Sequence, residues 1–210
     1  MIRPTRSKCA FACRASLGAM LCGLVVTPAA WTQPLSEAEI IAFARPPIPH
    51  GFSTYSAADR IRVSADRNAL AVLSGLLHGR VRTALQWDSA VVIWWLAESG
   101  DAKYLPVFLD GSRAADTTAV FNSAVYGLAR SASAPESTHR IEEIIRRGSE
   151  NSRRNTIALL AALNDADSRR LLRRSLSWDA LDPYMVDMAK RALARAEAPR
   201  ETARWPALQP

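Results

Sequence analysis

Side chains that commonly carry catalysis or bind metals are sparse in this sequence. It has three histidines, His50, His78 and His139, and no two of them have the HExxH spacing that places two zinc ligands on one helical face. The sequence also lacks a GxSxG nucleophile elbow and a glycine-rich phosphate loop. We therefore predict no catalytic residue, no metal site and no cofactor.

One pair of carboxylates has a spacing that could serve acid–base chemistry. Asp165 and Asp167 lie in a predicted turn between two helices. Paired carboxylates can act as general acid and base. An aspartate just before a helix more often accepts hydrogen bonds from the free N–H groups of the first helical turn. We interpret this pair as capping residues.

A basic helical face allows two interpretations. It could bind an anion or an acidic partner, or it could be a solvated face balanced by nearby acids, which is the interpretation that we favour. The chain has 27 basic and 20 acidic residues, and four of the basic ones lie in residues 1–30, which contain no acid, so the remainder has a net charge of only +3. This modest charge argues against nucleic-acid binding. The face comprises Arg169, Arg170, Arg173 and Arg174.

The adjacent tryptophans Trp94 and Trp95 also have two interpretations. Neighbouring residues of a helix point about 100° apart, so the two rings cannot share one narrow stripe. One ring could pack within its own helix pair and the other against the next pair. We favour this core interpretation over an exposed platform for a carbohydrate or another ligand.

The first 30 residues have the pattern of a secretory signal peptide. A basic start is followed by residues 15–26, which carry no charge, and then by small residues, so we expect cleavage after Ala29 or Ala30. The alternatives are an uncleaved anchor and a buried N-terminal helix; a helix needs about 20 apolar residues to span a bilayer, which argues against the anchor. All three cysteines precede residue 23, so the mature chain has no thiol. We predict an exported protein, periplasmic or secreted, with no stable membrane insertion after signal cleavage.

The mature chain is predicted to contain one helical domain. Residues 31–55 form an irregular proline-rich segment with a helical turn or two, residues 56–198 form the helical domain, and residues 199–210 form a tail. Apolar residues in the domain recur at helical spacing, and no alternating strand pattern is present. The fold class is therefore all-α.

A period of about 33 residues organises this domain. Helices are predicted to start at Trp87, Val120, Arg153 and Met185, at intervals of 33, 33 and 32 residues. A shorter helix precedes each of the last three, within 102–110, 136–147 and 168–177. Helix pairs that repeat every 30–45 residues, roughly, are typical of an α-solenoid. The fourth, seventh and eighth residues after each start are apolar or small: Val91, Trp94, Trp95, Ala124, Gly127, Leu128, Ile157, Leu160, Ala161, Ala189, Ala192 and Leu193.

Two of these helices carry motifs of a known repeat family. Tyr104-Leu-Pro-Val-Phe-Leu-Asp110 resembles the first helix of a HEAT repeat, and Val120-x-x-x-Ala-x-x-Gly-Leu-Ala129 resembles the second. Arg154 stands where the second helix commonly has an arginine, whereas Phe121 and Val186 depart from that pattern. The resemblance covers residues 66–197. It implies a right-handed α-solenoid of about four HEAT-like helix pairs and a protein-interaction role, and it carries over no catalytic residue.

The repeat also predicts a binding face. At 100° per residue, the second and sixth positions of each longer helix point away from its apolar stripe. The second positions are all short and polar, which suits hydrogen bonding to an extended partner segment; the alternative is that such residues are simply tolerated in a first helical turn. HEAT-like arrays line their concave side with second helices. The predicted partner-binding residues are Ser89, Asn122, Tyr126, Asn155, Asp187 and Arg191.

We therefore expect an exported, non-enzymatic helical-repeat module whose partner is another protein or an extended peptide segment, and not a nucleic acid. The main alternative is a HEAT-like lyase or another enzyme with a concave pocket of converging polar groups. A solenoid resembling the alkylpurine glycosylases is a further alternative, which export and the charge of the mature chain disfavour.

Overall fold

The computed structural model describes residues 34–45, 55–116 and 118–197. These ranges belong to a compact unit that begins at Pro34. The predicted signal peptide with its cysteines, residues 31–33 and 46–54 of the predicted proline-rich segment, which include His50, and the predicted tail lie outside the described residues. The expectations for those segments remain predictions.

Every regular element in the described ranges is a helix, so the all-α prediction is confirmed. None of these helices has the length and apolarity needed to cross a membrane. The elements are α1 (Glu37–Phe43), α2 (Ala57–Ala65), α3 (Arg67–Leu77), α4 (Ser89–Glu98), the 3₁₀ turn η3 (Ala102–Tyr104), α5 (Leu105–Gly111), α6 (Ala119–Arg130), α7 (Pro135–Arg147), α8 (Glu150–Leu163), α9 (Ala166–Ser175) and α10 (Pro183–Glu197).

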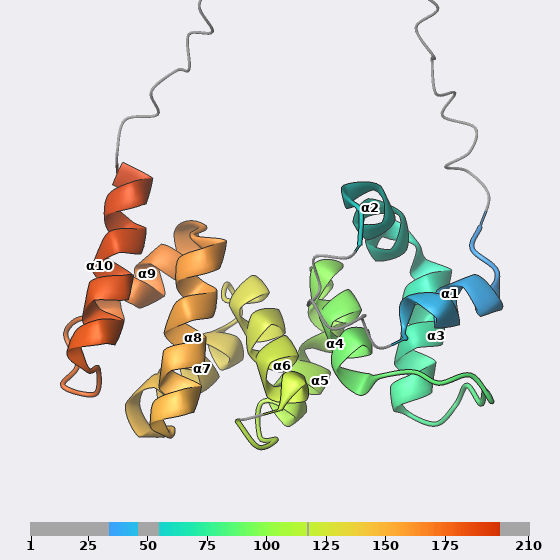
Figure 1. Cartoon of the computed structure of the whole chain (residues 1–210), viewed down its shortest axis with the longest axis horizontal. Coiled ribbons are helices and arrows are strands. Elements are labelled where there is room, and N and C mark those ends of the chain that lie inside the picture. Colours follow the sequence, from blue (N-terminus) through green and yellow to red (C-terminus); the bar gives the residue numbers. More distant parts are fainter. Residues whose placement is uncertain (1–33, 46–54, 117, 198–210) are drawn as a thin grey trace, which may run out of the picture. The chain divides into compact units, whose positions relative to one another are not determined.

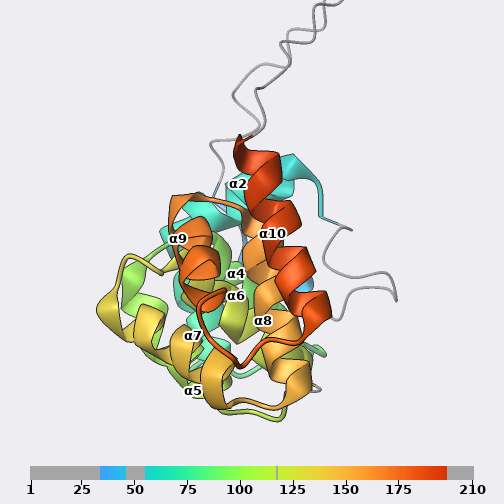
Figure 2. The same ribbon diagram turned by 90° about the vertical axis from the view of Figure 1, so that its left-hand side faces the viewer.

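From α4 onward the helices form two layers. The helices α4, α6, α8 and α10 lie side by side in chain order, and their amino ends are at the lower edge of Figure 1. The second layer contains α5, α7 and α9, which lie behind the first layer in Figure 1 and to its left in Figure 2. Each helix of this second layer also packs on the helix that follows it in the chain.

The core follows the period seen in the sequence. All twelve of the apolar or small positions that recur after the four predicted helix starts are buried. At Gly127, an added Cβ would lie 2.5 Å from the ring of Phe108, so the ring of α5 packs directly on the backbone of α6. Only a glycine permits this approach, which sets the spacing between the two layers at this point.

The short helix α1 contributes to the core as well. Ser36 caps it through a reciprocal pair of hydrogen bonds with Glu39. Ile40 and Ile41 are buried, and α1 packs on α3. A backbone hydrogen bond of 2.8 Å from the N–H of Asp88 to the carbonyl of Ala44 ties the end of α1 to the start of α4. The sequence indicated a helical turn here but not this docking.

Candidate functional site

Two asparagines one repeat apart form the centre of the predicted binding face. Asn122 lies in the first turn of α6 and Asn155 in the second turn of α8, and Thr118 and Ser149 cap the two helices. The side-chain amide nitrogen of Asn155 donates to the amide oxygen of Asn122 at 3.1 Å, and both residues are half-buried. The period of 33 residues thus places equivalent side chains in direct contact on neighbouring helices.

This amide pair retains hydrogen-bonding capacity. A primary amide has two donor hydrogens and a carbonyl oxygen with two lone pairs. Among the described residues, the bond between the two asparagines is the only hydrogen bond that either side chain makes. The NH₂ group of Asn122 and the carbonyl oxygen of Asn155 are therefore left to meet water or a ligand.

The predicted second-position residues form a row from α4 to α10: Ser89, Asn122, Asn155 and Asp187. The two ends of this row differ from its centre. Ser89 is the first residue of α4 and is half-buried. Asp187 and Arg191 lie exposed on α10 and form an ion pair with each other at 2.7 Å. No hydrogen bond among the described residues connects either end of the row to the two asparagines. The structure thus brings together only the central pair.

Tyr126 is engaged inside the molecule. Its hydroxyl group donates a hydrogen bond to a carboxylate oxygen of Glu98 on α4. The other carboxylate oxygen of Glu98 accepts from Arg60 of α2 at 2.7 Å, and only 8% of the Glu98 side chain is exposed. Burial, helped by the hydrogen bond to Glu98 and its charge, raises the pKa of Tyr126 to about 12. This network, absent from the sequence analysis, links α2, α4 and α6 and gives Tyr126 a structural role.

The two tryptophans lie in the core, so their predicted core location is confirmed. Trp94 is 6% exposed and Trp95 is fully buried, so an exposed ligand platform is ruled out. Tyr55 stacks on Trp94 at a centroid distance of 5.8 Å. The indole N–H of Trp95 and the hydroxyl of Tyr55 each donate to the backbone carbonyl of Phe43 at 2.9 Å. This aromatic cluster connects the end of α1 to α4.

The basic face of α9 is largely balanced by neighbouring groups. Arg170 pairs with Asp167 at 3.0 Å, and Arg174 pairs with Glu142 of α7 at 2.5 Å. Asp165 caps α9 by accepting from the N–H of Ser168 at 2.7 Å, so its predicted capping role is confirmed. The same prediction was wrong for Asp167, which lies inside the first turn of α9 and pairs with Arg170 instead. These contacts favour a solvated, charge-balanced face over an anion site.

A hollow outside this row lies between α3 and α5, with a volume of about 700 Å³. Ser74, His78 and Asp110 line it, but no hydrogen bond among the described residues joins these three side chains. Asp110 is 82% exposed and pairs with Arg113 at 2.9 Å. This arrangement is not an assembled nucleophile and base, and the described residues contain no cluster of metal-binding side chains.

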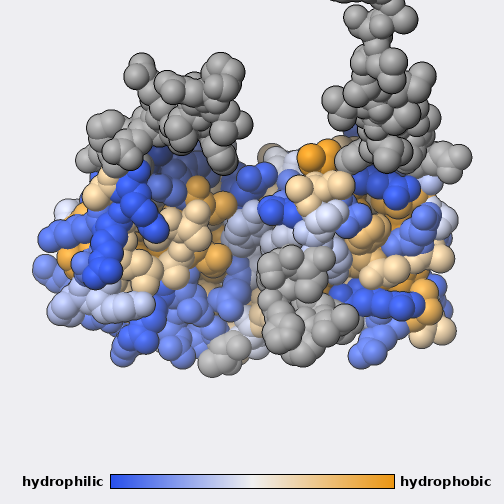
Figure 3. Space-filling view, turned by 45° about the horizontal axis from the view of Figure 1, so that its top comes forward, coloured by the Kyte–Doolittle hydropathy of each residue, from blue (hydrophilic) through white to orange (hydrophobic). Residues whose placement is uncertain are grey.

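Hydrophilic and apolar side chains alternate along the surface near α8 and α10. Figure 3 shows blue hydrophilic residues bordering a strip of tan and orange apolar residues on the side of these two helices. Leu159 of α8 and Met188 of α10 are half-buried and pack against the core. The polar row is thus accompanied by partly exposed apolar groups.

The chain matches no protein-family model, no curated protein and no solved structure.

Proposed function

We propose that the protein is an exported HEAT-like α-solenoid that binds an extended segment of another protein and is not an enzyme. Its four helix pairs are α3–α4, α5–α6, α7–α8 and α9–α10. The contacts within each pair, and those between successive second helices, support this assignment. The row from Ser89 to Asp187 along the second helices is the proposed binding face.

The contact between Asn122 and Asn155 is the observation that carries this proposal. It leaves one donor group and one acceptor group side by side, and a peptide bond offers the complementary carbonyl and N–H. Packed helices lie about 8–10 Å apart. An extended chain advances about 3.3 Å per residue, so roughly every third residue of a bound segment would meet the next helix. Half-burial of both amides excludes part of the competing water.

The contacts of the other row residues agree better with binding than with catalysis. Asp187 and Arg191 are joined in an ion pair, and the hydroxyl of Tyr126 is bonded to Glu98. A lyase or another enzyme requires reactive groups that converge on a substrate. The central pair instead consists of two neutral amides, which orient a partner by hydrogen bonding.

Selection from a library of displayed peptides tests the proposed face. We expect the wild-type protein to enrich peptides with a shared pattern, and the double variant Asn122→Ala/Asn155→Ala to lose binding to them by about ten-fold or more, since two hydrogen bonds are removed. The variant His139→Ala, on the exposed side of α7, is the matched control and should bind like wild type. Equal binding by the double variant and wild type would contradict the proposal.

The mature amino terminus tests the export part of the proposal. Mass spectrometry of the protein expressed in its native cell should find a chain beginning at Ala30 or Trp31, because the small residues at 27–30 follow a short apolar run. Recovery of a chain that keeps residues 1–30 in the cytosol would contradict export and leave the binding face unaffected.

A further inference from the structure

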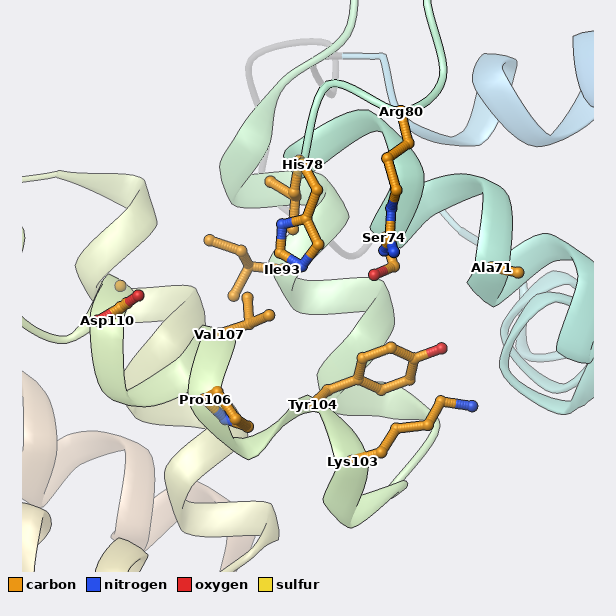
Figure 4. Close-up of a pocket in the computed structure, with 12 residues that line it drawn as sticks. Ala71, Ser74, His78, Arg80, Ile93, Lys103, Tyr104, Pro106, Val107 and Asp110 are labelled. Atoms are coloured by element: carbon orange, nitrogen blue, oxygen red, sulfur yellow. The ribbon is translucent and has the colours of Figure 1, made fainter.

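The hollow between α3 and α5 has the dimensions of a small-molecule site. Its volume of about 700 Å³ lies within the range typical of ligand pockets, about 300–1,000 Å³. It belongs to the start of the array, where α3 and α5 stand on either side of it (Figure 4). Further along, α5 packs on α7 and α7 on α9. The hollow is separate from the asparagine pair of α6 and α8.

The floor and walls of the hollow are apolar. The residues Ile93 of α4 and Tyr104 are 4% and 5% exposed. Leu77 of α3 and Val107 of α5 are half-buried along its sides. Burial of the apolar part of a ligand against these groups would remove hydrocarbon surface from water on both partners.

The guanidinium of Arg80 stands at one side of the rim, and the end of α3 fixes the position of this residue. Gly79 has a φ of 66°, a left-handed conformation that ends the helix after His78. The N–H groups of Arg80 and Val81 then both donate to the carbonyl of Gly75, at 2.8 and 3.1 Å. A Cβ at position 75 would lie 2.6 Å from the side chain of Val81. The glycine at this position therefore allows the close approach of Val81. This turn holds the backbone of Arg80 at the rim.

The charges around the hollow leave Arg80 without a counterion. Lys103 pairs with Asp101 at 2.8 Å, and Asp110 pairs with Arg113 at 2.9 Å. Among the described residues, no carboxylate forms an ion pair with Arg80. Figure 4 shows the side chains of His78 and Arg80 reaching from α3 and its following turn toward the hollow, opposite Tyr104 and Lys103.

We infer that this hollow binds a small amphipathic anion, a monocarboxylate with an aliphatic or aromatic body. The body lies against Ile93, Leu77 and Val107, and the carboxylate meets the guanidinium of Arg80. A guanidinium suits this role because its planar donors can bind both carboxylate oxygens at once. The imidazole of His78, on the same side, offers a further hydrogen bond.

Calorimetric titration of the purified protein with sodium decanoate, below its micelle concentration, tests the inference. We expect binding of one decanoate, loosened about ten-fold or more in Arg80→Gln because a charge-assisted contact is lost. Ala71→Trp should abolish binding, since Ala71 is exposed on α3 and borders the hollow, so the larger side chain would fill it. Arg82→Gln, an exposed arginine of the same loop outside the hollow, is the matched control and should bind like wild type.

A second titration separates charge recognition from simple apolar binding. Decyltrimethylammonium has a similar chain and the opposite charge, so it should neither bind in the hollow nor compete with decanoate. Equal affinity for both compounds, equal decanoate affinity in Arg80→Gln and wild type, or no decanoate binding at all would overturn the inference. Thermal denaturation of each variant checks that its fold is retained.

Discussion

Glu98 connects three helices through polar contacts at the edge of the core. It is nearly buried, and a buried carboxylate is costly unless its oxygens are paired. Arg60 supplies the charge partner and Tyr126 supplies a hydrogen bond, so both oxygens are satisfied. Arg60 also lies over the ring of Trp94 at 5.6 Å. These contacts make Tyr126 and Arg60 contributors to the packing of α2 and α6 on α4.

The variant Tyr126→Phe tests this role. It removes the hydroxyl donor while Arg60 still pairs with Glu98, so we expect the free energy of unfolding at neutral pH to fall by about 1–2 kcal/mol. Chemical denaturation measures the change. A loss below about 0.3 kcal/mol, within the range of ordinary surface substitutions, would contradict a structural role for the hydroxyl and leave it free for a partner.

The raised pKa of Tyr126 gives this variant a second signature. An unfolded tyrosine ionises near pH 10, whereas the folded pKa is about 12. Between these values the unfolded chain holds fewer protons than the folded one, so rising pH favours unfolding. The contribution of Tyr126 to stability is therefore present below pH 10 and is lost as the pH rises through 12. Melting temperatures should fall more steeply over this window for wild type than for Tyr126→Phe; parallel curves would contradict the assignment.

Sequence reasoning could predict some of these residues because they obey the repeat. Asn122 and Asn155 are 33 residues apart, so the period alone places them on neighbouring helices. Arg60 and Glu98 are 38 residues apart and belong to no repeated pattern, so their pairing emerges only from the packing of α2 on α4. The partner of the Tyr126 hydroxyl was unpredictable for the same reason.

The packing of the helices depends on small residues at close contacts. Gly127 of α6 faces the ring of Phe108, and Gly111 of α5 faces Ala124. The sequence predicted small or apolar residues along α6, and burial confirms it, but periodicity could not reveal which side chain each glycine accommodates. The docking of α1 was equally hidden, because a helix of seven residues is too short to show a clear apolar period.

The variant Gly127→Ala tests the close contact between α5 and α6. Alanine is favoured over glycine inside a helix by about 1 kcal/mol. Its Cβ would lie 2.5 Å from the Phe108 ring, and overpacking of this kind costs about 1–3 kcal/mol. We expect a net loss of stability and a lower melting temperature. Phe108→Leu should relieve the clash, so the double variant should lose less than the two single losses combined; additive losses or a stabilised Gly127→Ala would contradict this contact.

The repeated packing of α4, α6, α8 and α10 gives the protein a row of equivalent positions on one side. The period could be read from the sequence because these four helices bury the same positions. The differences between these helices could not be read from the sequence. The half-burial of the central asparagines and the exposure of Asp187 and Arg191 depend on the neighbours of each helix. The proposed partner segment would use the central pair for hydrogen bonds and the exposed end at α10 for charge contacts.

Site-specific photo-cross-linking in the native cell tests the proposed binding face most directly. A photoreactive benzoylphenylalanine is placed at Ser89 or Arg191, which flank the asparagine pair, and at Glu136 or His139, which are exposed on α7 in the other layer. We expect the two row positions to give cross-linked products with the same partner, and the α7 positions to give none. Those products should disappear when Asn122→Ala/Asn155→Ala is added. Cross-links to a partner only from the α7 positions, or products unaffected by the double variant, would contradict binding along this row.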